Sequence, residues 1–175
     1  MKNDKPKSSQ KNPHKISFSD LLYDFENKGG TVKMARKESF PMLAGSSLYL
    51  LNLKPGGLRT PHWHPNCAEL GYITKGTAEY AIVSNFGEKD GPFTAKAGDA
   101  VFIPKAYFHY IKNIGEDDLE ILIFFNDEKP EDIGLNEASA VLSDDILSQS
   151  FDIKDKNIFS DFDKGGDLII GKRKF

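Results

Sequence analysis

Two histidines separated by one residue, His62 and His64, give the sequence its clearest chemical signal. On an extended strand, residues two apart point to the same face, so the sequence places both imidazoles side by side. Glu69 follows after a short turn, which can return the chain antiparallel and bring a carboxylate beside them. A third imidazole, His109, comes from a later segment. Three imidazoles and a carboxylate predict a site for one divalent metal ion.

The spacing of the surrounding residues favours this site over two partly exposed imidazoles on an edge strand. The first stretch holds Gly56, His62, His64, Glu69 and Gly76, and the second holds Gly98, Pro104, His109 and Asn113. These intervals resemble the two motifs of the cupin superfamily. Ala106 is the one departure, because the second motif usually has glycine there, and it affects a turn and not a ligand.

A closer resemblance is to the second cupin half of bacterial oxalate decarboxylases, and it runs from about Ile16 to the C-terminus. It is carried by the runs Gly29 to Val32, Leu58 to Asn66, His109 to Gly115 and Ile133 to Asn136. Those enzymes contain two such halves in one chain, whereas this sequence has one. The resemblance implies an all-β double-sheet jelly roll closed into a small barrel.

Four protein ligands leave two free positions on a metal that prefers six, which suits Mn²⁺ or Fe²⁺. Catalytic Zn²⁺ more often has three protein ligands, while affinity alone would favour Cu²⁺ or Ni²⁺. The resemblance implies manganese, and the sequence itself leaves manganese and iron open.

Arg59 lies three residues before His62, an odd offset that on a continuous strand would aim it at the opposite face. The resemblance nevertheless implies that this arginine reaches the pocket, where a guanidinium can grip a carboxylate with two parallel hydrogen bonds. The alternative is a surface salt bridge.

Asp132 and its neighbour Glu131 lie in a stretch, Asn126 to Leu135, that resembles a mobile lid carrying a catalytic glutamate in the first half of those enzymes. The resemblance makes Asp132, with Glu131 beside it, the candidate proton donor; the alternative is an N-cap for the following helix. Ile123 occupies the position of a further pocket carboxylate, and an isoleucine cannot transfer a proton. This departure puts decarboxylase activity in question.

Short apolar runs cut by glycine and proline predict an all-β barrel over about residues 30–126. The expected strands are Thr31 to Arg36, Ser46 to Leu53, Leu70 to Thr74, Ala78 to Ser84, Ala100 to Ile103, His109 to Asn113 and Leu119 to Phe125. Gly91-Pro92 is among the expected breaks. Helical spacing predicts a short helix within Ile16 to Phe25 and two or three helices over about residues 131–163, one of them capped by Ser143.

The 175 residues and 39% hydrophobic content predict one domain, residues 16–175, behind a disordered basic tail at residues 1–15. The net charge of −3 conceals basic ends and an acidic body, which argues against nucleic acid as a partner. No apolar run is long enough to cross a membrane, and residues 1–15 lack the apolar core of a signal peptide. With a single cysteine, Cys67, these features predict a cytoplasmic protein.

The expected function is an oxalate decarboxylase-like enzyme that acts on a small carboxylate such as oxalate with manganese and oxygen. An oxalate oxidase, an iron-dependent dioxygenase and a non-catalytic metal- or ligand-binding cupin are the alternatives, because fold alone does not decide function. A homo-oligomer, with a dimer as the minimal unit, is expected because a single cupin must cover the apolar sheet face that two halves bury against each other.

Overall fold

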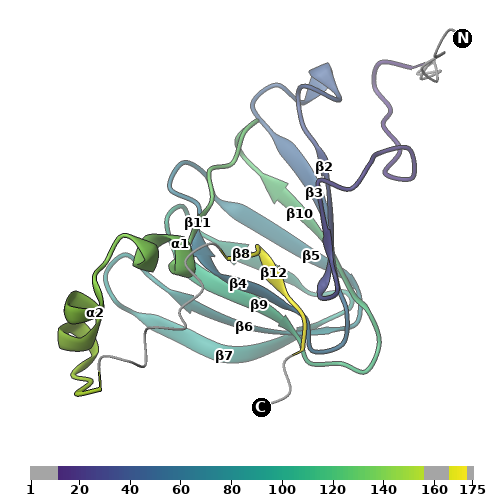
Figure 1. Cartoon of the computed structure of the whole chain (residues 1–175). Coiled ribbons are helices and arrows are strands. Elements are labelled where there is room, and N and C mark those ends of the chain that lie inside the picture. Colours follow the sequence, from purple (N-terminus) through teal and green to yellow (C-terminus); the bar gives the residue numbers. More distant parts are fainter. Residues whose placement is uncertain (1–11, 156–165, 173–175) are drawn as a thin grey trace, which may run out of the picture.

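The computed structural model describes residues 12–155 and 166–172. Two six-stranded antiparallel sheets face each other (Figure 1). The first has the order β1-β2-β3-β10-β5-β8, with bounds Phe25–Asn27, Gly30–Ala35, Ser47–Leu53, Leu119–Phe125, Glu69–Lys75 and Ala100–Ile103. The second has the order β11-β4-β9-β6-β7, with bounds Ile133–Gly134, Leu58–Trp63, Phe108–Asn113, Thr77–Val83 and Lys89–Lys96, and β12 (Ile169–Ile170) also pairs with β4. The all-β jelly roll expected from the sequence is confirmed.

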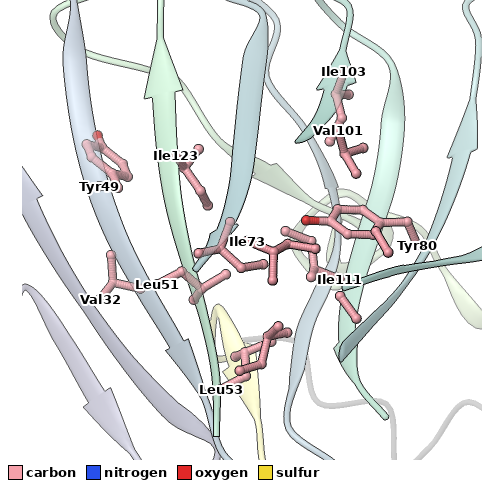
Figure 2. Packing of buried hydrophobic residues seen from close by; sticks show 14 of the residues in the cluster. Val32, Tyr49, Leu51, Leu53, Ile73, Tyr80, Val101, Ile103, Ile111 and Ile123 are labelled. Atoms are coloured by element: carbon pink, nitrogen blue, oxygen red, sulfur yellow. The ribbon is translucent and has the colours of Figure 1, made fainter. Parts of the chain in front are cut away.

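Strict alternation along the central strands of the first sheet produces the core. Every second side chain of β3 and β10 is buried, as the two-residue period of a strand requires. Leu53, Ile73 and Ile121 are fully shielded from solvent, and burial of each such side chain stabilises the fold by about 1.5–3 kcal/mol. Figure 2 shows Ile111 and Tyr80, from the second sheet, reaching toward Ile73 of the first. The core therefore joins the two sheets and fixes their separation.

The helix expected within Ile16 to Phe25 is wrong. This segment forms turns and bends, and then the first residue of β1. The Asp24 backbone pairs instead with β2, its N–H donating to Val32 O at 2.9 Å and its carboxylate accepting from Met34 N at 2.8 Å. Leu22, on the expected apolar helix face, is 87% exposed. The segment does not form the expected helix because the edge of β2 offers hydrogen-bond partners to its backbone. A helix would gain little from Leu22, because this side chain is exposed to solvent.

Gly91-Pro92 lies inside a strand and not at a break, because both residues belong to β7. This strand is at the edge of its sheet, and its pairing with β6 shifts register between Tyr80 and Ile82. Edge strands and bulges are the places in a sheet where proline is tolerated. Gly91 and Pro92 are therefore compatible with the pairing of β7 with β6.

In the described part of the chain, two helices follow the barrel, α1 (Leu135–Ala140) and α2 (Asp144–Phe151), and a 3-10 turn, η1, spans Pro41–Leu43. The Ser143 hydroxyl accepts from Ile146 N at 3.3 Å, which confirms the expected cap of α2. Residues 156–163 of the expected helical region, and residues 1–11 of the expected tail, lie outside the described residues. Among the described helices, none is long and apolar enough to span a bilayer.

Candidate metal centre

The two sheets contribute different ligands to one point inside the barrel. His62 lies on β4 directly opposite His109 on β9, and His64 comes just after β4 ends. Glu69 is the first residue of β5, in the opposite sheet. All four residues are at most 5% exposed, and one ligand atom from each lies within 4.8 Å of the others. The structure thus brings together the four residues that the sequence predicted.

The three imidazoles are oriented by backbone carbonyls. The Nδ1 atoms of His62, His64 and His109 lie 2.7, 2.6 and 2.9 Å from the carbonyl oxygens of residues 60, 131 and 107. A carbonyl oxygen only accepts, so each Nδ1 carries the hydrogen and each neutral ring keeps its lone pair on Nε2. This arrangement is how proteins fix the tautomer of a metal-binding histidine.

The atoms facing the centre lack hydrogen-bond partners among the described residues. His64 Nε2 and His109 Nε2 lie 3.2 and 3.4 Å from Glu69 Oε2, yet neither nitrogen is hydrogen-bonded, and Glu69 Oε1 is also unpaired. Buried polar atoms without partners are costly, and a cation bound among them would satisfy them. The donor set of three neutral nitrogens and one carboxylate fits a divalent transition metal.

The electrostatic surroundings favour this ligand state at His62 and Glu69. Burial lowers the pKa of His62 well below its ordinary value, and the nearby Arg59 adds to the effect. Burial alone would raise the pKa of Glu69, but contacts with His109 and His64 outweigh it and lower that pKa. Burial alone would lower the pKa of His64, but the Glu69 carboxylate raises it above the ordinary value.

Arg59 reaches the cavity because β4 is irregular. The pairing of β4 with β9 shifts register between Arg59 and His62, so one extra residue of β4 is accommodated there. Because of the extra residue, side chains three positions apart point to the same face of β4 here. Arg59, which is 8% exposed, therefore faces the same side as His62. Its guanidinium forms an ion pair with Asp132 and donates to Leu168 O at 3.3 Å. The three-residue offset alone would place Arg59 on the opposite face from His62, and the bulge in β4 brings it to the same face.

The segment from residue 126 to 134, here called the lid segment, contacts the site at His64 and Arg59. Asp132 lines the cavity, whereas the side chain of Glu131 is exposed and only its carbonyl touches the site, through His64. Asn66 holds this lid segment in place: its amide donates to Lys129 O at 3.0 Å and accepts from Glu131 N at 2.8 Å. Sequence reasoning missed this role of Asn66, because its partners are backbone atoms more than sixty positions away.

The cavity beside the ligands is small and mostly apolar. Its volume is about 40 Å³, room for roughly three or four waters. Its apolar wall is formed by Val32, Met34, Tyr49, Leu51, Ile111, Ile123, Phe125 and Leu168. Ile123 therefore lines the pocket, as the sequence comparison of that strand position implied. The cavity therefore suits a small ligand.

Cys67 lies two residues before Glu69 and is 2% exposed. Burial raises the pKa of its thiol to about 12, with the carboxylates of Asp127 and Glu69 adding to the effect. A thiol with so high a pKa is protonated at neutral pH, and only the thiolate is nucleophilic. Cys67 is therefore a small core side chain.

Comparison with known proteins agrees with this geometry. Oxalate decarboxylase OxdC of Bacillus subtilis (strain 168) is 32% identical over 128 residues, which are 73% of this chain and 33% of that protein. Germin-like protein 5-1 of Oryza sativa subsp. japonica is 29% identical over 136 residues, 74% of this chain and 61% of that protein. Oxalate oxidase GF-3.8 of Triticum aestivum is 31% identical over 88 residues, 49% of this chain and 39% of that protein.

A solved structure of the Bacillus subtilis oxalate decarboxylase, a protein with Mn(II) centres, aligns with a TM-score of 0.78 at 30% identity, covering 85% of this chain and 39% of that chain. The chain thus spans about a third of the length of the curated oxalate decarboxylase and about 60% of the germin-like protein. The family model named Cupin matches residues 18–158. The chain belongs to the cupin family.

Proposed function

We propose that this protein is a manganese-dependent enzyme of the oxalate decarboxylase type that acts on a small carboxylate such as oxalate. The observation that carries the proposal is the convergence of four metal-ligating side chains on a cavity that also holds one arginine and one aspartate. The relatives named as oxalate decarboxylases and oxalate oxidase support the substrate class.

His62, His64, His109 and Glu69 would hold the metal. Bound manganese supplies a Lewis acid that can also exchange an electron with a ligand. Arg59 would orient the substrate, because its planar guanidinium can grip a carboxylate in a fixed direction. The apolar wall excludes water, which strengthens each electrostatic contact inside the cavity.

Asp132 is the carboxylate placed to move a proton at the substrate, because it lines the cavity beside Arg59. A general acid must lie within hydrogen-bond reach of the group it protonates. The exposed side chain of Glu131 does not meet this condition in the arrangement described. Asp132 therefore takes the proton-transfer role, starting as the ionised partner of Arg59, and Glu131 contributes through its backbone.

A non-catalytic metal- or ligand-binding cupin is the second candidate, favoured by one observation. Ile123 lines the cavity at a position where a carboxylate would provide a further acid. With one wall apolar, a bound carboxylate meets fewer groups that can transfer protons. A protein that binds the ligand without turning it over remains consistent with that wall.

The deciding experiment uses protein produced in manganese- and in iron-supplemented medium, with the metal content of each measured. Each is incubated with oxalate, and formate and hydrogen peroxide are quantified. Formate with manganese supports the proposal, whereas peroxide would indicate an oxidase. Stoichiometric manganese with neither product would support the binding protein instead.

Arg59→Lys is the matching variant for the substrate role. A lysine keeps the charge but loses the two-pronged contact, so turnover should fall by at least tenfold while bound metal stays normal. Lys54→Arg, a change at an exposed cation paired with Asp118 at 2.8 Å, is the control and should leave turnover unchanged. Wild-type turnover by Arg59→Lys would refute the role of Arg59.

A further inference from the structure

The polar groups of the cavity define a charge balance. Besides the metal ligands, its lining contains two charged side chains, Arg59 and Asp132, which are paired with each other. A divalent metal, Arg59, Glu69 and Asp132 together leave one net positive charge when the imidazoles are neutral. Arg36 and Asp24, which contact the wall from outside through Tyr49 and Met34, carry opposite charges and cancel.

The net charge of the cavity has a large effect on ligand binding because the rest of the wall is mostly apolar. Leu51, Ile111 and Ile123 are at most 6% exposed and offer no dipole to a ligand. In such surroundings an unmatched charge is expensive, because few dipoles solvate it. The hydroxyl of Tyr49 is a dipole of this wall, and it already accepts from Arg36 Nε at 2.9 Å. A ligand with one negative charge would neutralise the cavity, whereas a ligand with two would leave it negative.

Asp132 also has an unused acceptor. One carboxylate oxygen, Oδ2, is paired with Arg59, while Oδ1 is buried and has no hydrogen-bond partner among the described residues. A ligand with an N–H or O–H donor at its second end would satisfy this oxygen. A second carboxylate at that end could not donate a hydrogen bond to Asp132 Oδ1, and the two negatively charged groups would repel each other.

We propose that the cavity selects carboxylates with a single negative charge and an uncharged second end, and that the Arg59–Asp132 pair is the specificity determinant. This deepens the proposed function, on which it rests, by naming the charge of the preferred ligand. Oxalate remains a ligand of the site, with lower affinity than a singly charged analogue of the same size.

Three compounds of equal heavy-atom number separate the contributions: oxalate with two charges, oxamate with one charge and an amide donor, and pyruvate with one charge and a methyl group. Their affinities for manganese-loaded wild-type protein are measured by calorimetry at pH 7. Oxamate should bind at least tenfold more tightly than oxalate, with pyruvate between them.

Asp132→Asn is the matched variant, because it adds one positive charge to the cavity at nearly constant shape. It should tighten oxalate binding at least tenfold and leave pyruvate within about threefold. Asp118→Asn removes an ion-paired aspartate far from the cavity and should leave all three affinities unchanged. Metal content is measured for every sample.

The outcomes distinguish the two proposals. If the wild-type protein loads with manganese but binds oxalate more tightly than oxamate, the charge selection is refuted and the proposed function stands. The same holds if Asp132→Asn leaves the ratio of oxalate to pyruvate affinity unchanged. If loaded protein binds none of the three anions, the proposed function fails and the inference fails with it. The wild-type order tests the inference even if the variant does not fold.

Discussion

At the scale of single residues, the site depends on which atom of each side chain is free. Each imidazole uses Nδ1 on a carbonyl and leaves Nε2 for the centre, so the same residue types in another rotamer would hold nothing. Arg59 and Asp132 illustrate the same point, since their pairing determines the charge a ligand meets. Three predictions belong to this scale.

His62→Ala combined with His109→Ala should abolish tight metal binding, because the double variant removes two of four ligands from a rigid centre. Metal content after desalting should fall from near one per chain to near zero. His14→Ala, which changes an exposed histidine at the end of the described chain, is the control and should retain its metal. Stoichiometric metal in the double variant would show that the ion binds elsewhere.

Acid should release the metal. Binding requires neutral imidazoles, whose ordinary pKa is about 6.5, so protons compete with the metal as pH falls below about 6. The low pKa of His62 keeps that ring neutral, whereas the raised pKa of His64 beside Glu69 makes that ring easier to protonate than the ring of His62. Metal content after equilibration between pH 4.5 and 8 measures the effect, with circular dichroism as the check on folding. Full occupancy at pH 4.5 would contradict it.

Ala106→Gly should stabilise the protein. Ala106 has φ of 64°, the left-handed region in which a side chain costs about 1–2 kcal/mol and glycine costs little. Part of the gain is lost to the greater freedom of glycine in the unfolded chain, so a net gain of about 0.5–1 kcal/mol in the free energy of unfolding is expected, measured by urea denaturation. Ala100→Gly, on strand β8, should instead destabilise, and a loss of stability in both variants would contradict the explanation.

At the scale of elements, two irregularities position the site. The bulge of β4 turns Arg59 into the cavity, and the turn at Ala106 precedes the strand that carries His109, with Ala106 N donating to His64 O at 2.9 Å. Further along the chain, the lid segment is joined to a metal ligand by the 2.6 Å contact of His64 with residue 131. These features make the geometry of the ligands sensitive to segments that supply no ligand themselves.

Asn66→Ala should therefore weaken metal binding although Asn66 is not a ligand. Its side chain holds the lid backbone at two points, and loosening the lid frees the ring of His64. Loss of an orienting partner of a metal ligand typically costs 10–100-fold in affinity, so a weakening of about tenfold is expected in a competition assay with a chelating dye. Asn85→Ala, in the β6–β7 turn, is the control. Unchanged affinity in both variants would show that the lid does not hold His64.

At the scale of the whole molecule, the first sheet exposes a contiguous apolar surface that could bind another protein chain. Phe124, Leu70 and Phe102 lie side by side across β10, β5 and β8, and are 45%, 40% and 61% exposed. Tyr72, on the same face of β5, is 43% exposed. Contiguous apolar surface of this kind is typical of protein–protein contacts, and a second copy of the chain offers the same surface.

We therefore expect a homodimer at micromolar concentration, measured by light scattering coupled to gel filtration. Phe102→Asp combined with Phe124→Asp should convert it to a monomer with its metal still bound. Phe86→Asp, which changes an aromatic residue that is 88% exposed in the β6–β7 turn, should leave the dimer intact. A monodisperse wild-type monomer would contradict this expectation.

The sequence by itself determined the metal ligands and the central strands. Both follow from rules that act over a few residues. Side chains two residues apart lie on the same face of a strand, and apolar side chains at alternate positions indicate that this face is buried. His62, His64 and the strand Leu119–Phe125 were therefore readable without coordinates. Fixed spacing between motifs added Glu69 and His109, because the family resemblance supplied the pairing that local rules lack.

The tertiary structure alone decided what depends on distant backbone. The expected helix within Ile16 to Phe25 gave way to pairing with β2, and Arg59 reached the cavity through a register shift against β9. Asn66 and Glu131 act through contacts more than sixty positions apart. None of these has a local signature, because a strand edge, a bulge and a backbone acceptor become available only when the rest of the barrel is in place.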